Sequence, residues 1–271
     1  MSGHVRGQTH RPLAWFRVLR PASQAIGRII CLPHAGGSAS FFHPWARVLP
    51  PGVEMVAIQY PGREERIEEG CIDNMRLMIE ALVQALTATP QLLSKPYVLF
   101  GHSMGAAVAY ELCLALQQHP VRLPCRLALS AIEGPGRARP GALHRAGDRV
   151  LLDEVIRLNP RLTYLLSMPE LTSLVLPALR SDYRLIETYG GELPSLARVT
   201  VPLVALLGQE DSELSEEDAR AWQCVCGCDF HLQTYPGGHF YLTDHYPALT
   251  DLLTSAWGSR SLALPAWTDL P

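Results

Sequence analysis

The sequence predicts an α/β fold in which helices cover both faces of a mostly parallel sheet. Three observations support this prediction. Short apolar runs of strand length alternate with segments of helical periodicity along most of the chain. The segment 104–116 is apolar on nearly every side, which is typical of a helix that packs on a buried sheet. Strands that alternate with helices are joined by crossover connections, and these make neighbouring strands parallel.

The expected elements follow one another in a regular order. Strands are expected at 14–19, 28–32, 53–58, 97–100, 127–132, 201–207 and 230–235. Helices are expected at 73–86, 104–116, 150–158, 171–188, 214–222 and 243–257. In the first of these helices the apolar residues recur at helical spacing, and Asp73 is the expected N-cap. The long helical interval before the strand at 201–207 is interpreted as an insertion over one edge of the sheet.

The composition is that of a globular protein. Of the 271 residues, 48% are hydrophobic and 18% are charged, which excludes disorder and a coiled coil. The formal net charge is −3, so no nucleic-acid or anionic-membrane partner is expected. No apolar run approaches the roughly 18 residues that span a bilayer, and the first residues lack the apolar region of a signal peptide. We therefore expect a cytoplasmic protein, and the odd number of cysteines argues against a disulfide framework.

A G-x-S-x-G pattern, Gly101-His102-Ser103-Met104-Gly105, lies between an expected strand and an expected helix. This context is the one that the motif requires when its serine is a nucleophile on a tight turn. Glycines are expected at both flanks because the turn is crowded and a side chain at either position would clash. Ser103 is therefore the candidate nucleophile. The simpler interpretation is a glycine-rich turn with a solvated serine.

A serine hydroxyl becomes a good nucleophile only when a neighbouring base takes its proton, and the usual chain order for this motif is serine, acid, histidine. Of the ten histidines, His239 follows a late strand in a loop, and it is the candidate base. The orienting acid is expected in the loop 208–213 after the strand at 201–207. Asp211 is the candidate, with Glu210 and Glu213 as alternatives. The same acidic loop could instead compensate the dipole of the helix that follows it.

An oxyanion hole needs two backbone N–H groups that converge on one point. The residue after the nucleophile, Met104, supplies one donor. The second is expected in the loop after an early strand, and in the stretch 34–37 we choose Ala35. The alternative is a glycine-rich turn that binds no ligand.

No cofactor and no metal site are expected. Cys224, Cys226 and Cys228 are separated by single residues, whereas zinc-binding thiolates are normally spaced by two or more residues with a second pair elsewhere. They are interpreted as buried or idle thiols, and no role is assigned to them. The loop 33–38 is rich in glycine but lacks both common phosphate-binding patterns.

Six segments resemble, in chain order, the stand-alone type II thioesterases of polyketide and nonribosomal peptide biosynthesis. They are PHAGGSASFF at 33–42, YPGRE at 60–64, GHSMG at 101–105, LRSDYRLIETY at 179–189, GQED at 208–211 and PGGHFYL at 236–242. The resemblance spans nearly the whole chain, and the combination is far more specific than G-x-S-x-G alone. The N-terminal extension and the cysteine-rich segment look less like this family.

The resemblance implies an α/β-hydrolase fold with a core of residues 1–134 and 196–271 and a helical lid at 135–195. It implies a triad of Ser103, Asp211 and His239, with oxyanion donors at Ala35 and Met104. The implied activity is hydrolysis of aberrant or stalled acyl groups from the phosphopantetheine arm of an acyl or peptidyl carrier protein. We expect a monomer that uses no cofactor. Two alternatives stay open: an acyltransferase that uses the same acyl-serine, and a non-catalytic binding module of the same fold.

The lid segment also suggests how a carrier protein would be recognised. Between residues 137 and 184 there are eight arginines and five acids, in a chain whose total charge is negative. Carrier proteins of this family's pathways are typically acidic, so a basic lid could steer them toward Ser103. The alternative is that these arginines are solvated helix faces that pair with nearby acids.

Overall fold

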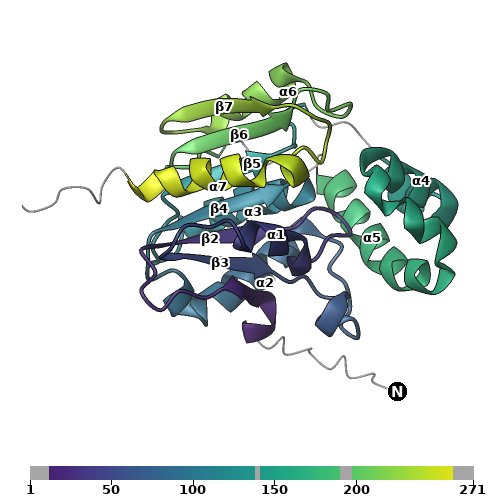
Figure 1. Ribbon diagram of the computed structural model, residues 1–271, viewed down its shortest axis with the longest axis horizontal. Helices are drawn as coiled ribbons and strands as arrows, with labels where there is room; N and C mark the ends of the chain where they lie inside the picture. Colours follow the sequence, from purple (N-terminus) through teal and green to yellow (C-terminus); the bar gives the residue numbers. More distant parts are fainter. Residues whose placement is uncertain (1–11, 138–140, 190–196, 259–271) are drawn as a thin grey trace, which may run out of the picture.

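A seven-stranded sheet runs through the molecule, with helices on both sides (Figure 1). The computed structural model describes residues 12–137, 141–189 and 197–258. The strands are β1 (Phe16–Arg20), β2 (Gly27–Leu32), β3 (Val53–Ile58), β4 (Tyr97–His102), β5 (Arg126–Ser130), β6 (Leu203–Gly208) and β7 (Phe230–Tyr235). Among them the predicted strands 53–58 and 230–235 have the predicted bounds.

The strand order is β1-β3-β2-β4-β5-β6-β7. Strands β2 to β7 pair in parallel, and β1 pairs antiparallel with β3 at the edge, so the predicted mostly parallel sheet is confirmed. The chain adds β3 on one side of β2 and then β4 on the other side. Such a reversal of direction opens a crevice at the carboxyl ends of the strands, where open α/β sheets bind their ligands.

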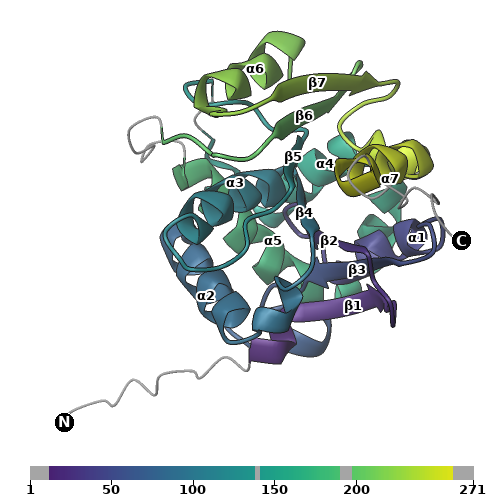
Figure 2. The same ribbon diagram turned by 90° about the vertical axis from the view of Figure 1, so that its left-hand side faces the viewer.

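Two apolar cores lie on the two faces of the sheet, because successive side chains of a strand point to opposite faces. In β2, Ile30 and Leu32 pack into the core under α2 (Met75–Thr87) and α3 (Met104–Leu116). Ile29 and Cys31 pack into the other core, under α1 (His43–Ala46) and α7 (Leu242–Gly258). Figure 2 shows α2 and α3 on one side of the sheet and α1 and α7 on the other.

Helix α3 has the predicted bounds and is buried along most of its length. Helix α2 carries the predicted apolar face, but its N-cap is Asn74, whose side chain accepts a hydrogen bond from the Leu77 N–H. The prediction of Asp73 as the cap is therefore wrong by one residue. Asp73 instead forms an ion pair with Arg184.

The segment between β5 and β6 is helical. It contains α4 (Asp148–Leu158), a 3₁₀ segment (Pro160–Ser167) and α5 (Pro169–Tyr189). Figure 1 shows α4 and α5 together beyond one end of the sheet, while α5 also reaches α2 and α3. These helices therefore lie where the carboxyl-end crevice opens.

Two predicted elements differ in kind from the structure, and others, such as β4, β5 and β6, differ only in their bounds. The predicted strand 14–19 begins as a 3₁₀ turn (Pro12–Trp15), and the predicted helix 214–222 is divided into α6 (Glu216–Arg220) and a 3₁₀ segment (Ala221–Val225). Helix α6 begins late because Ser215 and Asp218 form a reciprocal capping box at its start. Within the described residues, no helix is long and apolar enough to cross a membrane.

Candidate active site

Ser103 stands at the turn between β4 and α3, with φ +53° and ψ −124°. Few residues other than glycine adopt such a conformation, and it persists only where the surroundings enforce it. Here the Ser103 N–H donates to the Ser130 carbonyl at 2.7 Å, and its carbonyl accepts from the Ala106 N–H at 2.8 Å. The strained turn is therefore held by β5 on one side and by the first turn of α3 on the other.

The two glycines of the motif are required by close backbone contacts. A Cβ on Gly101 would lie 2.1 Å from the Gly105 carbonyl oxygen. A Cβ on Gly105 would lie 2.2 Å from the Leu32 carbonyl oxygen. Both contacts are with main-chain atoms that cannot move aside, so the predicted clash at both flanks is confirmed. The close approach also brings α3 onto the carboxyl end of β2.

His239 and Asp211 come together from two neighbouring loops. Asp211 follows β6, His239 follows β7, and the His239 Nδ1 lies 2.9 Å from the Asp211 Oδ2. The side chain of Asp211 is fully buried and that of His239 is 8% exposed. The second carboxylate oxygen of Asp211 accepts the Glu213 N–H at 2.9 Å. The carboxylate is thus fixed on both oxygens, and it fixes the imidazole in turn.

The same two loops also hold each other. The Glu210 N–H donates to the Gly237 carbonyl at 3.0 Å, and Gly208 permits this approach because a Cβ there would lie 2.3 Å from the Gly237 oxygen. Glu210 and Glu213, the two alternative acids, are exposed. Glu213 pairs with Arg157. The structure therefore places Asp211, and neither alternative, on the His239 ring.

Ser103, His239, Ala35 and Met104 all line one cavity of about 560 Å³. Met104 is the first residue of α3, where backbone N–H groups have no partner inside the helix. Ala35 follows β2 in a tight turn in which the Gly37 N–H donates to the carbonyl of His34 at 2.9 Å. The five residues selected from the sequence thus lie around the crevice between β2, β4 and the β6 and β7 loops.

Two buried histidines beside this site were not selected from the sequence, because both precede Ser103. The ring centroid of His102 lies 5.3 Å from that of His239 and 5.9 Å from that of His34. Burial, and then the charge of His239, lower the pKa of His102 well below its usual value and that of His34 to about 3. Both rings therefore stay neutral at neutral pH. The sequence feature that could have identified these two histidines is their position inside the PHAGG and GHSMG motifs.

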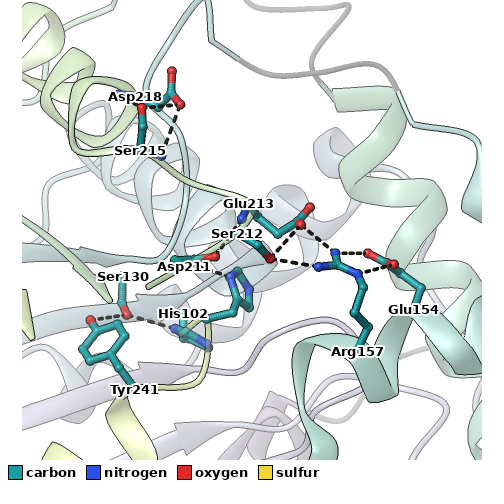
Figure 3. A network of polar contacts seen from close by, with 11 residues as sticks. His102, Ser130, Glu154, Arg157, Asp211, Ser212, Glu213, Ser215, Asp218 and Tyr241 are labelled. Carbon is teal, nitrogen blue, oxygen red and sulfur yellow. Dashed lines mark hydrogen bonds and ion pairs between the residues drawn. The ribbon is translucent and has the colours of Figure 1, made fainter. Parts of the chain in front are cut away.

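His102 also belongs to a buried chain of polar groups with Ser130 and Tyr241, which Figure 3 shows. Its Nδ1 lies 2.9 Å from the Ser130 Oγ, and that oxygen lies 2.7 Å from the Tyr241 hydroxyl. This chain connects the ends of β4 and β5 to the start of the C-terminal helix. It fixes the His102 ring next to that of His239.

A second network joins helix α4 to the loop that carries Asp211 (Figure 3). Arg157 donates to Glu154 at 2.7 Å, to Glu213 at 2.6 Å and to the Ser212 hydroxyl at 2.8 Å. Hydrogen bonds from Arg157 lower the pKa of Glu154, although partial burial opposes them. Sequence reasoning did not find this contact because its partners lie more than fifty residues apart.

Most of the described arginines between residues 137 and 184 form ion pairs with acids. Arg139 lies outside the described residues, and six of the seven others are paired. The pairs are Arg137–Glu217, Arg149–Asp153, Arg157–Glu154, Arg161–Asp244, Arg180–Asp148 and Arg184–Asp73. Arg145 donates to the His144 ring. Much of the positive charge counted in the sequence is therefore compensated locally.

The cysteine-rich segment begins in the 3₁₀ segment after α6 and continues into the residues that precede β7. Cys224 and Cys228 are exposed and Cys226 is half-buried, and all three thiols are free. In the part of the chain that the structure describes, no three His, Cys, Asp or Glu side chains gather as a metal site would require.

The chain is similar to known thioesterases. A family model described as "Thioesterase domain" matches residues 27–256. Thioesterase PikA5 of Streptomyces venezuelae is 40% identical over 244 residues, which cover 88% of this chain and 85% of that protein. A probable cadicidin biosynthesis thioesterase of Streptomyces griseus is 37% identical over 242 residues, which cover 89% of this chain but 65% of that protein.

A solved structure gives the same result for the fold. The type II thioesterase BorB from the borrelidin biosynthetic cluster superposes with a TM-score of 0.81 at 36% identity, over 90% of this chain and 97% of that one. Together with the strand order, this similarity confirms the α/β-hydrolase fold that the sequence predicts.

Proposed function

The chain belongs to the thioesterase domain family, and from this premise we propose that it is a serine thioesterase of polyketide or nonribosomal peptide biosynthesis. Its substrates are acyl groups, aberrant or stalled, on the phosphopantetheine arm of an acyl or peptidyl carrier protein. The observation that carries this proposal is the hydrogen bond between Asp211 and His239 on the wall of a cavity that also exposes Ser103.

In the acylation step, His239 takes the proton of the Ser103 hydroxyl while the serine oxygen attacks the thioester carbonyl carbon. Asp211 holds Nδ1 of the imidazole. This contact leaves Nε2 to accept the serine proton, and the carboxylate stabilises the imidazolium that forms. The tetrahedral oxyanion accepts hydrogen bonds from the Ala35 and Met104 N–H groups, and losing one such donor costs about 3 kcal/mol of transition-state stabilisation. His239 then protonates the departing thiolate, and the carbon–sulfur bond breaks.

Deacylation repeats these roles with water as the nucleophile. His239 takes a proton from water, the hydroxide attacks the acyl-serine carbonyl, and the proton passes to the Ser103 oxygen as the free acid leaves. The neutral state of His34 and His102 suits this cycle. Because their rings resist protonation, neither competes with His239 for the serine proton.

In this proposal residues 135–195 form a lid on a core of residues 1–134 and 196–271. Its support is the position of α4 and α5 at the open end of the crevice and the presence of lid residues Leu143, Leu158 and Ile186 in the cavity wall. These three apolar side chains suit an acyl chain, and the carrier protein docks outside. No cofactor is needed for this chemistry.

The decisive experiment is a panel of acylated carrier proteins assayed for release of free thiol and free acid. The wild-type protein should release both in equal amounts, and Ser103→Ala should lower kcat by about 10⁴-fold or more while it remains folded. Thiol release without free acid, together with acyl transfer to an added alcohol or amine, would instead show an acyltransferase.

A fluorophosphonate probe separates a hydrolase from a binding module. Intact-mass analysis should show one adduct on the wild-type protein and none on Ser103→Ala. A wild-type protein that neither accepts the probe nor releases thiol would overturn the proposed function.

A further inference from the structure

Two of the segments that resemble the family, YPGRE and LRSDYRLIETY, meet in space although the triad uses neither of them. Arg63 of the first and Asp182 of the second lie 119 residues apart in sequence. Their side chains form a two-point ion pair, with Nη1 to Oδ2 at 2.6 Å and Nη2 to Oδ1 at 2.9 Å. Asp182 is 1% exposed and Arg63 is 7% exposed. A charge pair buried to this extent is expensive to desolvate, so its position calls for a reason other than stability.

The pair contacts the loop that carries Ala35. The Asp182 Oδ2 accepts a hydrogen bond from the Gly36 N–H at 2.8 Å. Arg63 donates to the Gly37 carbonyl at 3.0 Å. The ion pair thus holds two peptide groups close to the proposed oxyanion donor, one through the Gly36 N–H and one through the Gly37 C=O.

Packing reinforces these bonds. Gly36 has φ +74°, and a Cβ there would lie 2.7 Å from a methyl carbon of Leu179, one turn before Asp182 on α5. Burial alone would lower the pKa of the Arg63 guanidinium, but the charge and hydrogen bonds of Asp182 outweigh burial and raise it. The Arg63 guanidinium therefore stays charged, and α5 contacts the loop directly through Leu179 and Asp182.

We propose that Asp182, held by Arg63, is a positioning residue that fixes the loop 34–37 so that the Ala35 N–H points at the oxyanion. Through this contact the placement of α5 sets the geometry of the oxyanion hole. The inference rests on the proposed function, because an oxyanion forms only if Ser103 attacks a carbonyl. The inference adds that the proposed lid is coupled to the loop 34–37 through the buried carboxylate of Asp182.

The proposal predicts an effect on the transition state that exceeds the effect on substrate binding. Asp182→Asn keeps the shape of the side chain but turns an amide N–H toward one of its donors. We expect kcat to fall about 10- to 100-fold, a displaced donor costing less than a deleted one, while KM changes less than about twofold. The affinity for an acyl trifluoromethyl ketone, which forms a tetrahedral adduct with the serine, should fall by the same factor as kcat.

A matched control lies on the same helix. Arg184 pairs with Asp73 at 2.9 Å and, like Asp182, joins α5 to the core, but its partner is a residue before α2 and not part of the loop 34–37. Arg184→Gln should leave kcat and the affinity for the ketone within about twofold of wild type. Equal losses in both variants would overturn the proposal, because they would show a general requirement for lid attachment.

A second variant separates positioning from stability. Arg63→Met with Asp182→Leu replaces the buried pair by apolar side chains, an exchange that often preserves folding, yet it removes the acceptor of the Gly36 N–H. This double variant should remain folded by circular dichroism and lose kcat as Asp182→Asn does. Wild-type kcat in the folded double variant would overturn the inference and leave the proposed function intact. An inactive wild-type protein would overturn both.

Discussion

Lowering the pH from 7.5 to 5 should destabilise this protein by about 4 kcal/mol through His34 and His102. Both rings are buried, and the pKa of His34 lies at about 3 while that of His102 lies well below its usual value. In the unfolded chain both titrate near 6.5. As the pH falls below 6.5, the unfolded state therefore binds two protons that the native state does not bind. Stability is fully present above that pH and is lost progressively down to the native-state pKa.

The magnitude follows from the linkage between proton binding and unfolding. Each histidine that stays neutral in the native state costs about 1.4 kcal/mol per pH unit below 6.5, or about 2 kcal/mol at pH 5. Ordinary carboxyl groups titrate mainly below pH 5, so the interval from 6.5 to 5 reports chiefly on histidines. The loss is a large part of the 5–15 kcal/mol by which a typical domain is stable.

The assay is urea unfolding at constant ionic strength, followed by circular dichroism at half-unit steps between pH 7.5 and 5. His102→Asn removes one of the two buried rings while an amide remains to pair with the Ser130 hydroxyl. The slope of unfolding free energy against pH should fall by about half. His119→Asn is the matched control because His119 is exposed, and its slope should equal that of wild type. A His102→Asn slope that matches wild type would refute the reasoning.

Three further predictions concern the acid, the turn and the lid. Asp211→Asn should lower kcat about 10⁴-fold, because the amide favours the wrong imidazole tautomer. Glu213→Gln should lower kcat less than about tenfold. If Glu213→Gln lowered kcat more than Asp211→Asn, Glu213 would be the acid that orients His239. Gly105→Ala should lower the free energy of unfolding by about 3 kcal/mol in a thermal or urea titration, because its Cβ would lie 2.2 Å from a main-chain oxygen. If the lid steers acidic carrier proteins, kcat/KM for acylated carrier proteins should fall as the salt concentration rises. Charge reversal of Arg145 and Arg149 should lower it as well. For a small neutral thioester, kcat/KM should change with neither the salt nor the substitutions. Equal responses of the two substrates would show that the lid does not steer.

The sequence predicts most of the sheet and its buried helices, because burial on both faces leaves an unambiguous apolar pattern. The bounds of β3, β7 and α3 agree with the prediction residue for residue. One error lies where a single side chain decides the start of a helix. Both Asp73 and Asn74 are residue types that can cap a helix. The actual cap is the residue whose side-chain oxygen accepts the Leu77 N–H, and the sequence pattern does not show which of two adjacent residues this is.

Four of the five selected site residues line one cavity, and Asp211 lies behind His239, because the order of strands brings their loops together. Residues that follow β2, β4, β6 and β7 must all appear at the carboxyl edge of a parallel sheet, so strand position in the sequence is enough to select them. Strand position does not decide between Asp211 and Glu213, because both lie in the same loop. The choice depends on which carboxylate the backbone turns inward, and Glu213 turns outward to Arg157, a partner on a distant helix.

The contact of Asp182 with Arg63 and Gly36 joins two motifs that are far apart in the sequence. Each segment can be matched to the family by its residues, but the sequence does not indicate that the two segments are in contact. Their partnership depends on α5 crossing the end of the sheet, a long-range arrangement with no local periodicity. Because a buried carboxylate that loses its partner is costly, neither segment can change alone without a penalty. The two motifs are therefore one structural unit, and that unit ends on the peptide group next to Ala35.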